Sequence, residues 1–195
     1  MCRSPLAERL TVSWVRQTSG GTAERITVSS AGLQAPAGRG MDPLSEAELV
    51  RLGGDPTGFA ARRFTPVMAE DADLVLTMTR RQRRAVLEAA PRGLRRTFTL
   101  LEAADLLGRA DLEGLQRLAP AARAQELARR LDAERAFRAS SQADDIADPI
   151  GQPARVHHDV AERIAAALGP LASALFQPGG SGGESITWGG FAAAS

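Results

Sequence analysis

The sequence predicts an α/β domain with a parallel sheet, and two observations lead to this prediction. Short apolar runs that fit strands alternate along the chain with longer segments whose apolar residues recur at helical spacing. The run at residues 74–78, Leu-Val-Leu-Thr-Met, is apolar almost throughout. Such a run is typical of a strand that is buried on both faces, as strands of parallel sheets are.

Capping residues and glycines predict the elements of the first part of the chain. Ser4 suits a helix N-cap, and Pro5 suits the first turn of the same helix. Gly53 and Gly54 are typical of a helix end. The elements expected here are a helix from Ser4 that ends at 19–21, a strand over 24–30, a loop over 31–40 and a helix over 43–52.

The remainder of the chain continues the same alternation. We expect a strand over 74–78, a helix over 80–89 capped by Thr79, and a second strand over 97–101. Helical segments should follow over 102–138, with breaks near Gly108, Gly114 and Pro120. After them we expect a polar loop over 140–152 and a helix over 153–175 that is interrupted at Gly169-Pro170. We therefore expect one domain over residues 1–175. The tail, 176–195, is rich in Gly, Ser and Ala, and we expect it to be disordered.

The composition excludes several classes of protein. The net charge of +1 gives no large field of the kind that binds nucleic acid or an anionic membrane. No apolar segment is long enough to span a membrane, and Met1 is not followed by a signal peptide, so we expect a cytoplasmic protein. All 24 basic residues are Arg, and Lys, Asn and Tyr are absent, which indicates a G/C-rich, bacterial genome. A single cysteine predicts no internal disulfide and no cysteine-based zinc site.

Two short motifs carry possible chemistry. The string Cys2-Arg3-Ser4-Pro5 precedes a helix, where backbone N–H groups and an Arg form a site for an anion such as phosphate. Asp148-Pro149 lies in a polar loop and suits a general acid that protonates a leaving oxygen. The alternatives are an incidental Arg at a helix start and an ordinary Asp-Pro turn.

With these two motifs in this order, the chain resembles the low-molecular-weight protein tyrosine phosphatase family from Met1 to about Leu175. The matching pieces are Cys2-Arg3-Ser4-Pro5-Leu6-Ala7-Glu8, Ser30-Ala31-Gly32-Leu33, Met41-Asp42-Pro43, Ala72-Asp73-Leu74-Val75-Leu76-Thr77-Met78 and Asp148-Pro149-Ile150-Gly151. The resemblance implies a three-layer α/β/α fold with a four-stranded parallel sheet. It also implies hydrolysis of phosphotyrosine in proteins, or of small phosphomonoesters, through a cysteinyl-phosphate intermediate, with no metal and no cofactor.

The resemblance assigns roles to individual residues. Arg3 matches the Arg that binds the phosphoryl oxygens, Ser4 the hydroxyl that steadies the thiolate, and Asp148 the general acid. Cys2 matches a second cysteine of the phosphate loop, so Cys2, Arg3 and Ser4 are the expected phosphate-binding residues. The nucleophilic cysteine and the central first strand would lie before Met1. We therefore expect the natural protein to start upstream and the chain as written to be inactive.

Other functions remain open at this point. One alternative is a non-catalytic phosphate-binding or regulatory homologue, and another is a truncated pseudo-enzyme with no stable fold. A third is an arsenate reductase of the same fold, although such enzymes need further redox cysteines. Ile150 stands where the family commonly has an aromatic residue, which leaves specificity for phosphotyrosine open. His157, His158 and the arginines at 80–84 are expected to lie on solvated helix faces.

Overall fold

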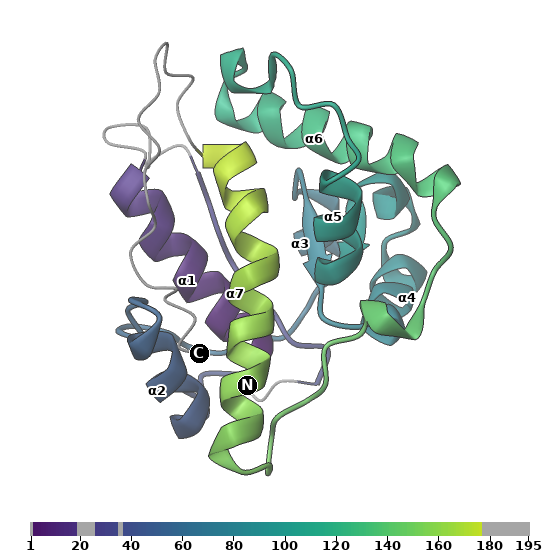
Figure 1. Cartoon of the computed structure of the whole chain (residues 1–195). Coiled ribbons are helices and arrows are strands. Elements are labelled where there is room, and N and C mark those ends of the chain that lie inside the picture. Colours follow the sequence, from purple (N-terminus) through teal and green to yellow (C-terminus); the bar gives the residue numbers. More distant parts are fainter. Residues whose placement is uncertain (1, 19–25, 35–36, 177–195) are drawn as a thin grey trace.

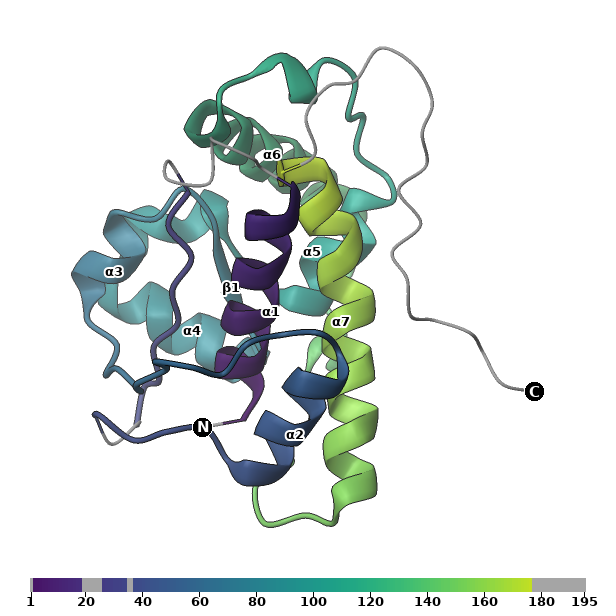
Figure 2. The ribbon, with the colours of Figure 1, turned by 90° about the vertical axis from the view of Figure 1, so that its left-hand side faces the viewer.

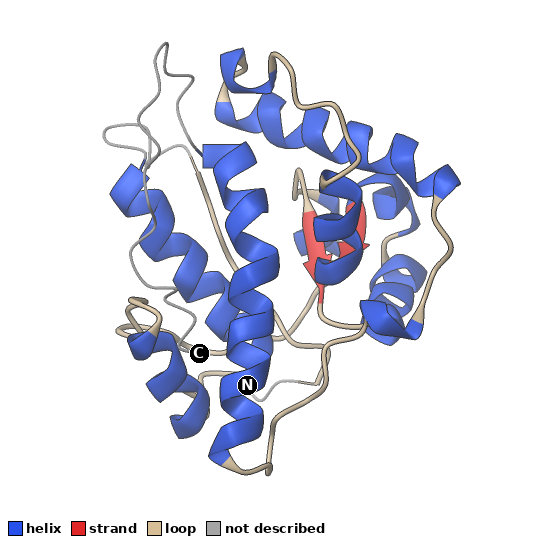
Figure 3. Cartoon of the chain, in the orientation of Figure 1, coloured by secondary structure: helices blue, strands red, loops and turns tan. Residues whose placement is uncertain are grey.

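A computed structural model describes residues 2–18, 26–34 and 37–176 as a layered arrangement of helices around a small parallel sheet (Figures 1 and 3). The helices are α1 (Arg3–Thr18), α2 (Pro43–Arg51), α3 (Pro66–Glu70), α4 (Arg80–Ala89), α5 (Leu100–Leu107), α6 (Pro120–Glu134) and α7 (Ala154–Phe176). The strands are β1 (Val75–Thr77) and β2 (Thr97–Thr99). No helix of these described residues is long and apolar enough to cross a membrane.

The sheet confirms the predicted parallel pairing and positions the rest of the fold. β1 and β2 run parallel, with Leu76 opposite Phe98, and α4 forms the crossover between them. Both strands contact α4 and α5. Figure 2 shows β1 between α3 and α4 on one side and α5 on the other. The three-layer α/β/α prediction is therefore correct, although the sheet has two strands in the described part of the chain.

The strand expected over 24–30 is not formed as predicted. Residues 26–31 are described and belong to no strand, while 24 and 25 lie outside the described residues. In this region a single parallel bridge joins Gly32 to Arg63. A strand requires a neighbour that pairs with its N–H and C=O groups, and β1 pairs only with β2 in the described sheet.

Helix ends differ from the predictions in three places. α1 begins at Arg3, so Cys2 lies directly before the helix, and its carbonyl oxygen accepts a hydrogen bond from the Leu6 N–H. α5 begins at Leu100 because Thr99 and Glu102 form a reciprocal capping box, which shortens the predicted strand. α7 continues through Pro170, where we predicted an interruption. Burial on both sides of Pro170, at Leu168 and Leu171, offsets the hydrogen bond that proline cannot donate.

The core lies where α1, α5, α6 and α7 meet the sheet. It includes the fully buried side chains Leu10, Leu49, Phe98, Leu106, Leu131 and Ile164. α7 packs along α1 and also contacts α2 and α5, as both ribbon views show. The starts of α1, α2 and α7 are thus brought to one end of the molecule. The tail that we expected to be disordered begins with Phe176 at the end of α7, and the rest of it, 177–195, lies outside the described residues.

Two threonine caps allow a direct test of how α4 and α5 are fixed. We expect Thr99→Ala to lower the free energy of unfolding by about 1–2 kcal/mol, because it removes one half of a capping box whose two residues are both buried. Thr79→Ala removes a single cap bond to Gln82 at a half-buried position and should cost about 1 kcal/mol or less. Urea unfolding followed by circular dichroism measures both. A larger loss for Thr79→Ala would contradict this account.

Candidate active site

Arg3 and Asp148, which lie at opposite ends of the domain sequence, contact each other in the structure. Arg3 Nη2 lies 2.9 Å from Asp148 Oδ2, and Arg3 Nη1 donates a hydrogen bond of 2.5 Å to the carbonyl oxygen of Ile146. The Arg3 side chain is 12% exposed, whereas that of Asp148 is 53% exposed. The largely buried guanidinium of Arg3 therefore pairs with a solvent-exposed carboxylate, that of Asp148.

The loop that carries Asp148, residues 145–153, is anchored at the carboxyl end of β1. The N–H of the buried Ile146 donates a 2.8 Å hydrogen bond to the carbonyl oxygen of Met78, which follows β1. Asp145 Oδ1 accepts a 2.6 Å hydrogen bond from the N–H of Arg80 at the start of α4. Ligands of open parallel sheets bind outside the carboxyl ends of the strands. The loop therefore places Asp148 at the edge where such sites are found.

Cys2 is close to Arg3 in sequence but lies in a different environment. Its side chain is 3% exposed. Burial raises the pKa of the Cys2 thiol above its ordinary value, and a hydrogen bond with Ser45 opposes this only in part. The thiolate is the nucleophilic form of cysteine, and reactive cysteines have a lowered pKa. Cys2 is therefore not prepared to act as a nucleophile.

His157 contradicts the expectation of a solvated histidine. It is 2% exposed, and its Nδ1 lies 3.0 Å from Ser45 Oγ and 3.5 Å from Asp42 Oδ1. The physical reason is that α2 covers the face of α7 on which His157 lies. His158 is exposed as expected, with Nδ1 3.2 Å from Glu48 Oε2.

Sequence reasoning did not connect Asp42 and Ser45 with Cys2. The one available signal was Asp42-Pro43, an N-cap followed by a first-turn proline, and Asp42 does cap α2 by accepting hydrogen bonds from the N–H groups of Leu44 and Ser45. Ser4, the remaining predicted site residue, is half-buried in the first turn of α1 beside Arg3. Its assigned role toward a thiolate stays a prediction.

Comparison with known proteins bears on this geometry. The family described as low molecular weight phosphotyrosine protein phosphatase matches residues 1–113, which is more than half of the chain. The chain belongs to this family. The matched region includes Cys2, Arg3 and Ser4, while Asp148 lies beyond its end.

Curated relatives in the phosphatase family are similar over part of their length. The chain is 33% identical over 91 residues to the low molecular weight protein-tyrosine-phosphatase Wzb of Salmonella typhi, covering 47% of this chain and 56% of that protein. It is 28% identical over 100 residues to the low molecular weight protein-tyrosine-phosphatase Ptp of Acinetobacter johnsonii, covering 51% of this chain and 65% of that protein. The chain thus spans little more than half the length of the curated relatives it matches.

Solved structures share the phosphatase fold at low sequence identity. Vibrio vulnificus Wzb in complex with benzylphosphonate aligns with a TM-score of 0.57 and 18% identity, covering 89% of this chain and 90% of that one. The YwlE arginine phosphatase from Geobacillus stearothermophilus aligns with a TM-score of 0.59 and 22% identity, covering 88% of this chain and 84% of that one. At these identities the likeness establishes the fold alone.

The residue that follows Asp148-Pro149 in this family member is aliphatic and exposed. Ile150 is 54% exposed, and its N–H lies 3.5 Å from Asp148 Oδ1. In the loop 30–33, the Ser30 N–H donates a 2.6 Å hydrogen bond to Glu8 Oε2 of α1. Leu33, at the end of that loop, is half-buried. Neither position presents an aromatic ring.

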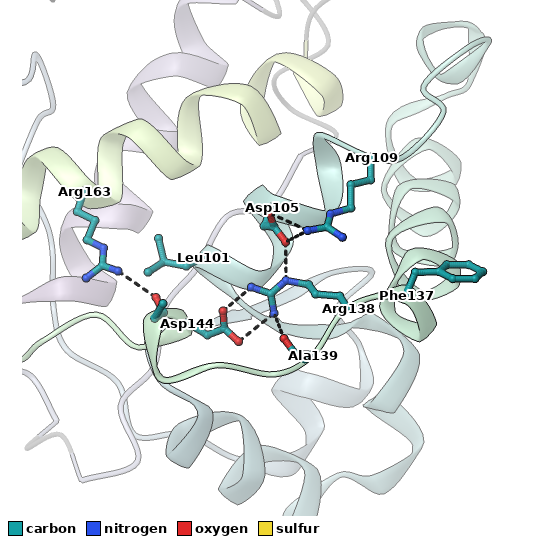
Figure 4. A pocket seen from close by; sticks show the side chains of 9 residues that line it. Leu101, Asp105, Arg109, Phe137, Arg138, Ala139, Asp144 and Arg163 are labelled. Atoms are coloured by element: carbon teal, nitrogen blue, oxygen red, sulfur yellow. Dashed lines mark hydrogen bonds and ion pairs between the residues drawn. The ribbon is translucent and has the colours of Figure 1, made fainter.

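A cavity of about 510 Å³ lies apart from Arg3 and Asp148, which are not among its lining residues (Figure 4). In this cavity Arg138 donates hydrogen bonds to Asp105 of α5 and to Asp144, and Arg109 pairs with Asp105 at 3.1 Å. The Arg138 guanidinium lowers the pKa of the Asp144 carboxyl. These charges neutralise one another and attach the segment 138–144 to α5. These ion pairs therefore hold the segment that leads into the loop of Asp148 against α5.

The two arginines of this cavity make a matched pair for mutation. Arg138→Met leaves the carboxylate of Asp144, whose side chain is 3% exposed, without the cation that pairs with it, and we expect a loss of about 3–5 kcal/mol in unfolding free energy. Arg109→Met removes an exposed ion pair and should cost less than about 1 kcal/mol. Urea unfolding at pH 7 measures the difference in unfolding free energy between the two variants. Equal losses would contradict the conclusion that Arg138, and not Arg109, holds the buried Asp144.

The same ion pair predicts a pH dependence. The pKa of Asp144 is lowered in the folded state. The ionised carboxylate therefore stabilises the fold fully at pH values above the ordinary Asp pKa of about 3.9, and this stabilisation is lost as the pH falls through the pKa that Asp144 has in the folded protein. The stability gap between the wild type and Arg138→Met should therefore narrow below about pH 4. Unfolding curves at pH 7, 4 and 3 check this, and a gap that widens on acidification would rule it out.

Proposed function

We propose that this chain is the greater part of a phosphatase that hydrolyses phosphomonoesters, with phosphotyrosine in proteins as its substrate. The observation that carries the proposal is the 2.9 Å contact between Arg3 and Asp148. The chain belongs to the phosphatase family. The resemblance of its motifs implies that Arg3 corresponds to the phosphate-binding Arg of that family and Asp148 to its general acid. We place the enzyme in the bacterial cytoplasm. The net charge of +1 supports an enzyme with no nucleic-acid or anionic-membrane partner.

The residues divide the reaction between them. The guanidinium of Arg3 and the N–H groups at the start of α1 bind the phosphoryl oxygens and stabilise their charge. A thiolate attacks phosphorus, so that an S–P bond forms while the P–O bond to the leaving group breaks. Asp148, protonated at this step, gives its proton to the departing oxygen. Asp148 then takes a proton from water as that water attacks phosphorus and releases phosphate and the thiolate.

The bound phosphoryl group and Asp148 compete for the same cation. The Arg3 guanidinium carries five N–H donors, and the contacts with Asp148 and Ile146 engage two of its nitrogens. A dianion that binds Arg3 displaces the carboxylate toward the leaving oxygen, where a general acid has to lie. The exposure of the Asp148 side chain, 53%, supports this movement.

We propose that the nucleophile is a cysteine in a segment that precedes Met1. Cys2 is buried with a raised pKa, and it is the one cysteine of the 195 residues. Residues 26–31 belong to no strand and the described sheet has two strands, and both observations support an additional upstream strand with which they would pair. A non-catalytic phosphate-binding homologue is the second candidate, and the lack of another cysteine in these residues favours it. Arsenate reduction is less favoured because it needs further thiols.

The test uses the chain of 195 residues and a version extended through the in-frame upstream codons. We expect hydrolysis of p-nitrophenyl phosphate by the extended protein alone, and loss of it when the upstream cysteine is changed to Ser. Activity of the 195-residue chain would refute the assignment of Cys2. Binding of vanadate without turnover by the extended protein would favour the binding homologue. An upstream sequence without a cysteine would end the proposal.

A change of Asp148 tests the general acid in the extended protein. We expect Asp148→Asn to reduce kcat for phenyl phosphate by about 10²–10⁴-fold, and to reduce it less for p-nitrophenyl phosphate, whose leaving group needs less protonation. Asp159→Asn is the matched control, since Asp159 is an exposed carboxylate on α7, the helix that follows the loop of Asp148. Equal losses on the two substrates would show that Asp148 is not the acid.

A further inference from the structure

Three groups that can bind a metal ion meet beneath the start of α1. The sulfur of Cys2, a carboxylate oxygen of Asp42 and a ring nitrogen of His157 all lie within 4.8 Å of one another. Cys2 is 3% exposed and His157 2%, and the Asp42 side chain is 22% exposed. This cluster, called here the Cys2 cluster, is not used by the proposed reaction. Sequence reasoning excluded a cysteine-based zinc site because it considered cysteines alone.

Each member of the Cys2 cluster is fixed by a different helix. Cys2 directly precedes α1 and is bonded to its first turn through the Leu6 N–H. Asp42 is the N-cap of α2, and His157 lies in the first turn of α7. These three helices pack against one another in pairs. Groups that are held by packed helices keep their relative positions, which is what a preformed metal site requires.

The polar groups of the cluster are not all satisfied by the protein. Nε2 of His157 is buried and has no hydrogen-bond partner in the described part of the chain. The contacts recorded for Asp42 with Leu44, Ser45 and His157 all involve Oδ1. Buried polar atoms in native proteins are nearly always paired, so the unpaired Nε2 of this ring, whose Nδ1 lies 3.5 Å from Asp42 Oδ1, requires an explanation.

We propose that Cys2, Asp42 and His157 form a binding site for Zn²⁺. Thiolate, imidazole and carboxylate are the donors that zinc takes, and three protein ligands with a fourth open position are a common arrangement. Donors bound at roughly 2.0–2.3 Å around one ion lie within about 4 Å of one another, so small side-chain rotations close the cluster. Mg²⁺ and Ca²⁺ are disfavoured because they prefer oxygen ligands throughout.

The site goes beyond the proposed phosphatase reaction and does not depend on it. Ser45 hydrogen-bonds to both Cys2 and His157 and would orient them around the ion. Cys2 adjoins Arg3, so a bound ion would also fix the start of the helix that carries the phosphate-binding Arg. The ion would add positive charge one residue from that Arg, which favours binding of an anion.

The experiment uses the tag-free 195-residue chain titrated with Co²⁺ and with Zn²⁺. We expect Co²⁺ to produce a thiolate-to-metal charge-transfer band in the near ultraviolet, Zn²⁺ to displace it, and Zn²⁺ to raise the Tm. Cys2→Ser should abolish the band. His157→Gln and Asp42→Asn should each weaken Zn²⁺ binding by more than about 100-fold. Ser45→Ala should weaken it by only about 10–100-fold, which is typical of a residue that orients a ligand without binding the metal.

His158→Gln is the matched control, because His158 is the exposed neighbour of His157 and lies outside the cluster. It should leave Zn²⁺ binding unchanged. A folded wild type that shows neither the Co²⁺ band nor a Tm shift would overturn the proposal, as would loss of binding in His158→Gln but not in His157→Gln. If the cluster variants fail to fold, X-ray absorption of the zinc-loaded wild type decides. One sulfur and one imidazole bound to zinc support the site, and a shell of oxygens alone overturns it.

Discussion

The arrangement of the site depends on the contacts that the guanidinium of Arg3 makes. It binds the carbonyl oxygen of Ile146 and the carboxylate of Asp148, and so joins the first residue of α1 to the loop that leads into α7. Ile146 is itself bonded to the backbone after β1. One side chain therefore links the start of the chain, the carboxyl end of the sheet and the acid-bearing loop, and its planar set of donors suits such a multiple role.

This contact is possible because three helices begin at the same end of the molecule. The pairwise packing of α1, α2 and α7 brings their first turns together, while the sheet and α5 lie to one side. Helix starts carry unpaired N–H groups and a partial positive charge, so carboxylates are stabilised there. Asp42 meets this need at α2 as its N-cap. At α1 the arginine in the first position adds its own charge to an end that already favours an anion.

Sequence reasoning predicted the parts of this arrangement that depend on local signals. The Thr79 cap and the helix after it, the apolar run at β1, and the assignment of Arg3 and Asp148 to one site by family resemblance were all available from the chain. Properties that depend on distant neighbours were not. Whether residues 26–31 form a strand depends on a partner, and whether His157 is buried depends on α2, which is far away in sequence. The continuation of α7 through Pro170 likewise reflects packing that a local breaker signal does not record.

Two neighbouring residues at the start of α1 meet opposite physical requirements. Arg3 keeps its charge because its guanidinium reaches a carbonyl and a carboxylate at the edge of the fold. Cys2 points into the core, where burial favours the neutral thiol and raises its pKa. The proposed attack on phosphorus needs a thiolate within reach of the phosphoryl group, and a buried neutral thiol provides neither the charge nor the access. In the proposed reaction, therefore, the nucleophile has to come from a residue other than Cys2.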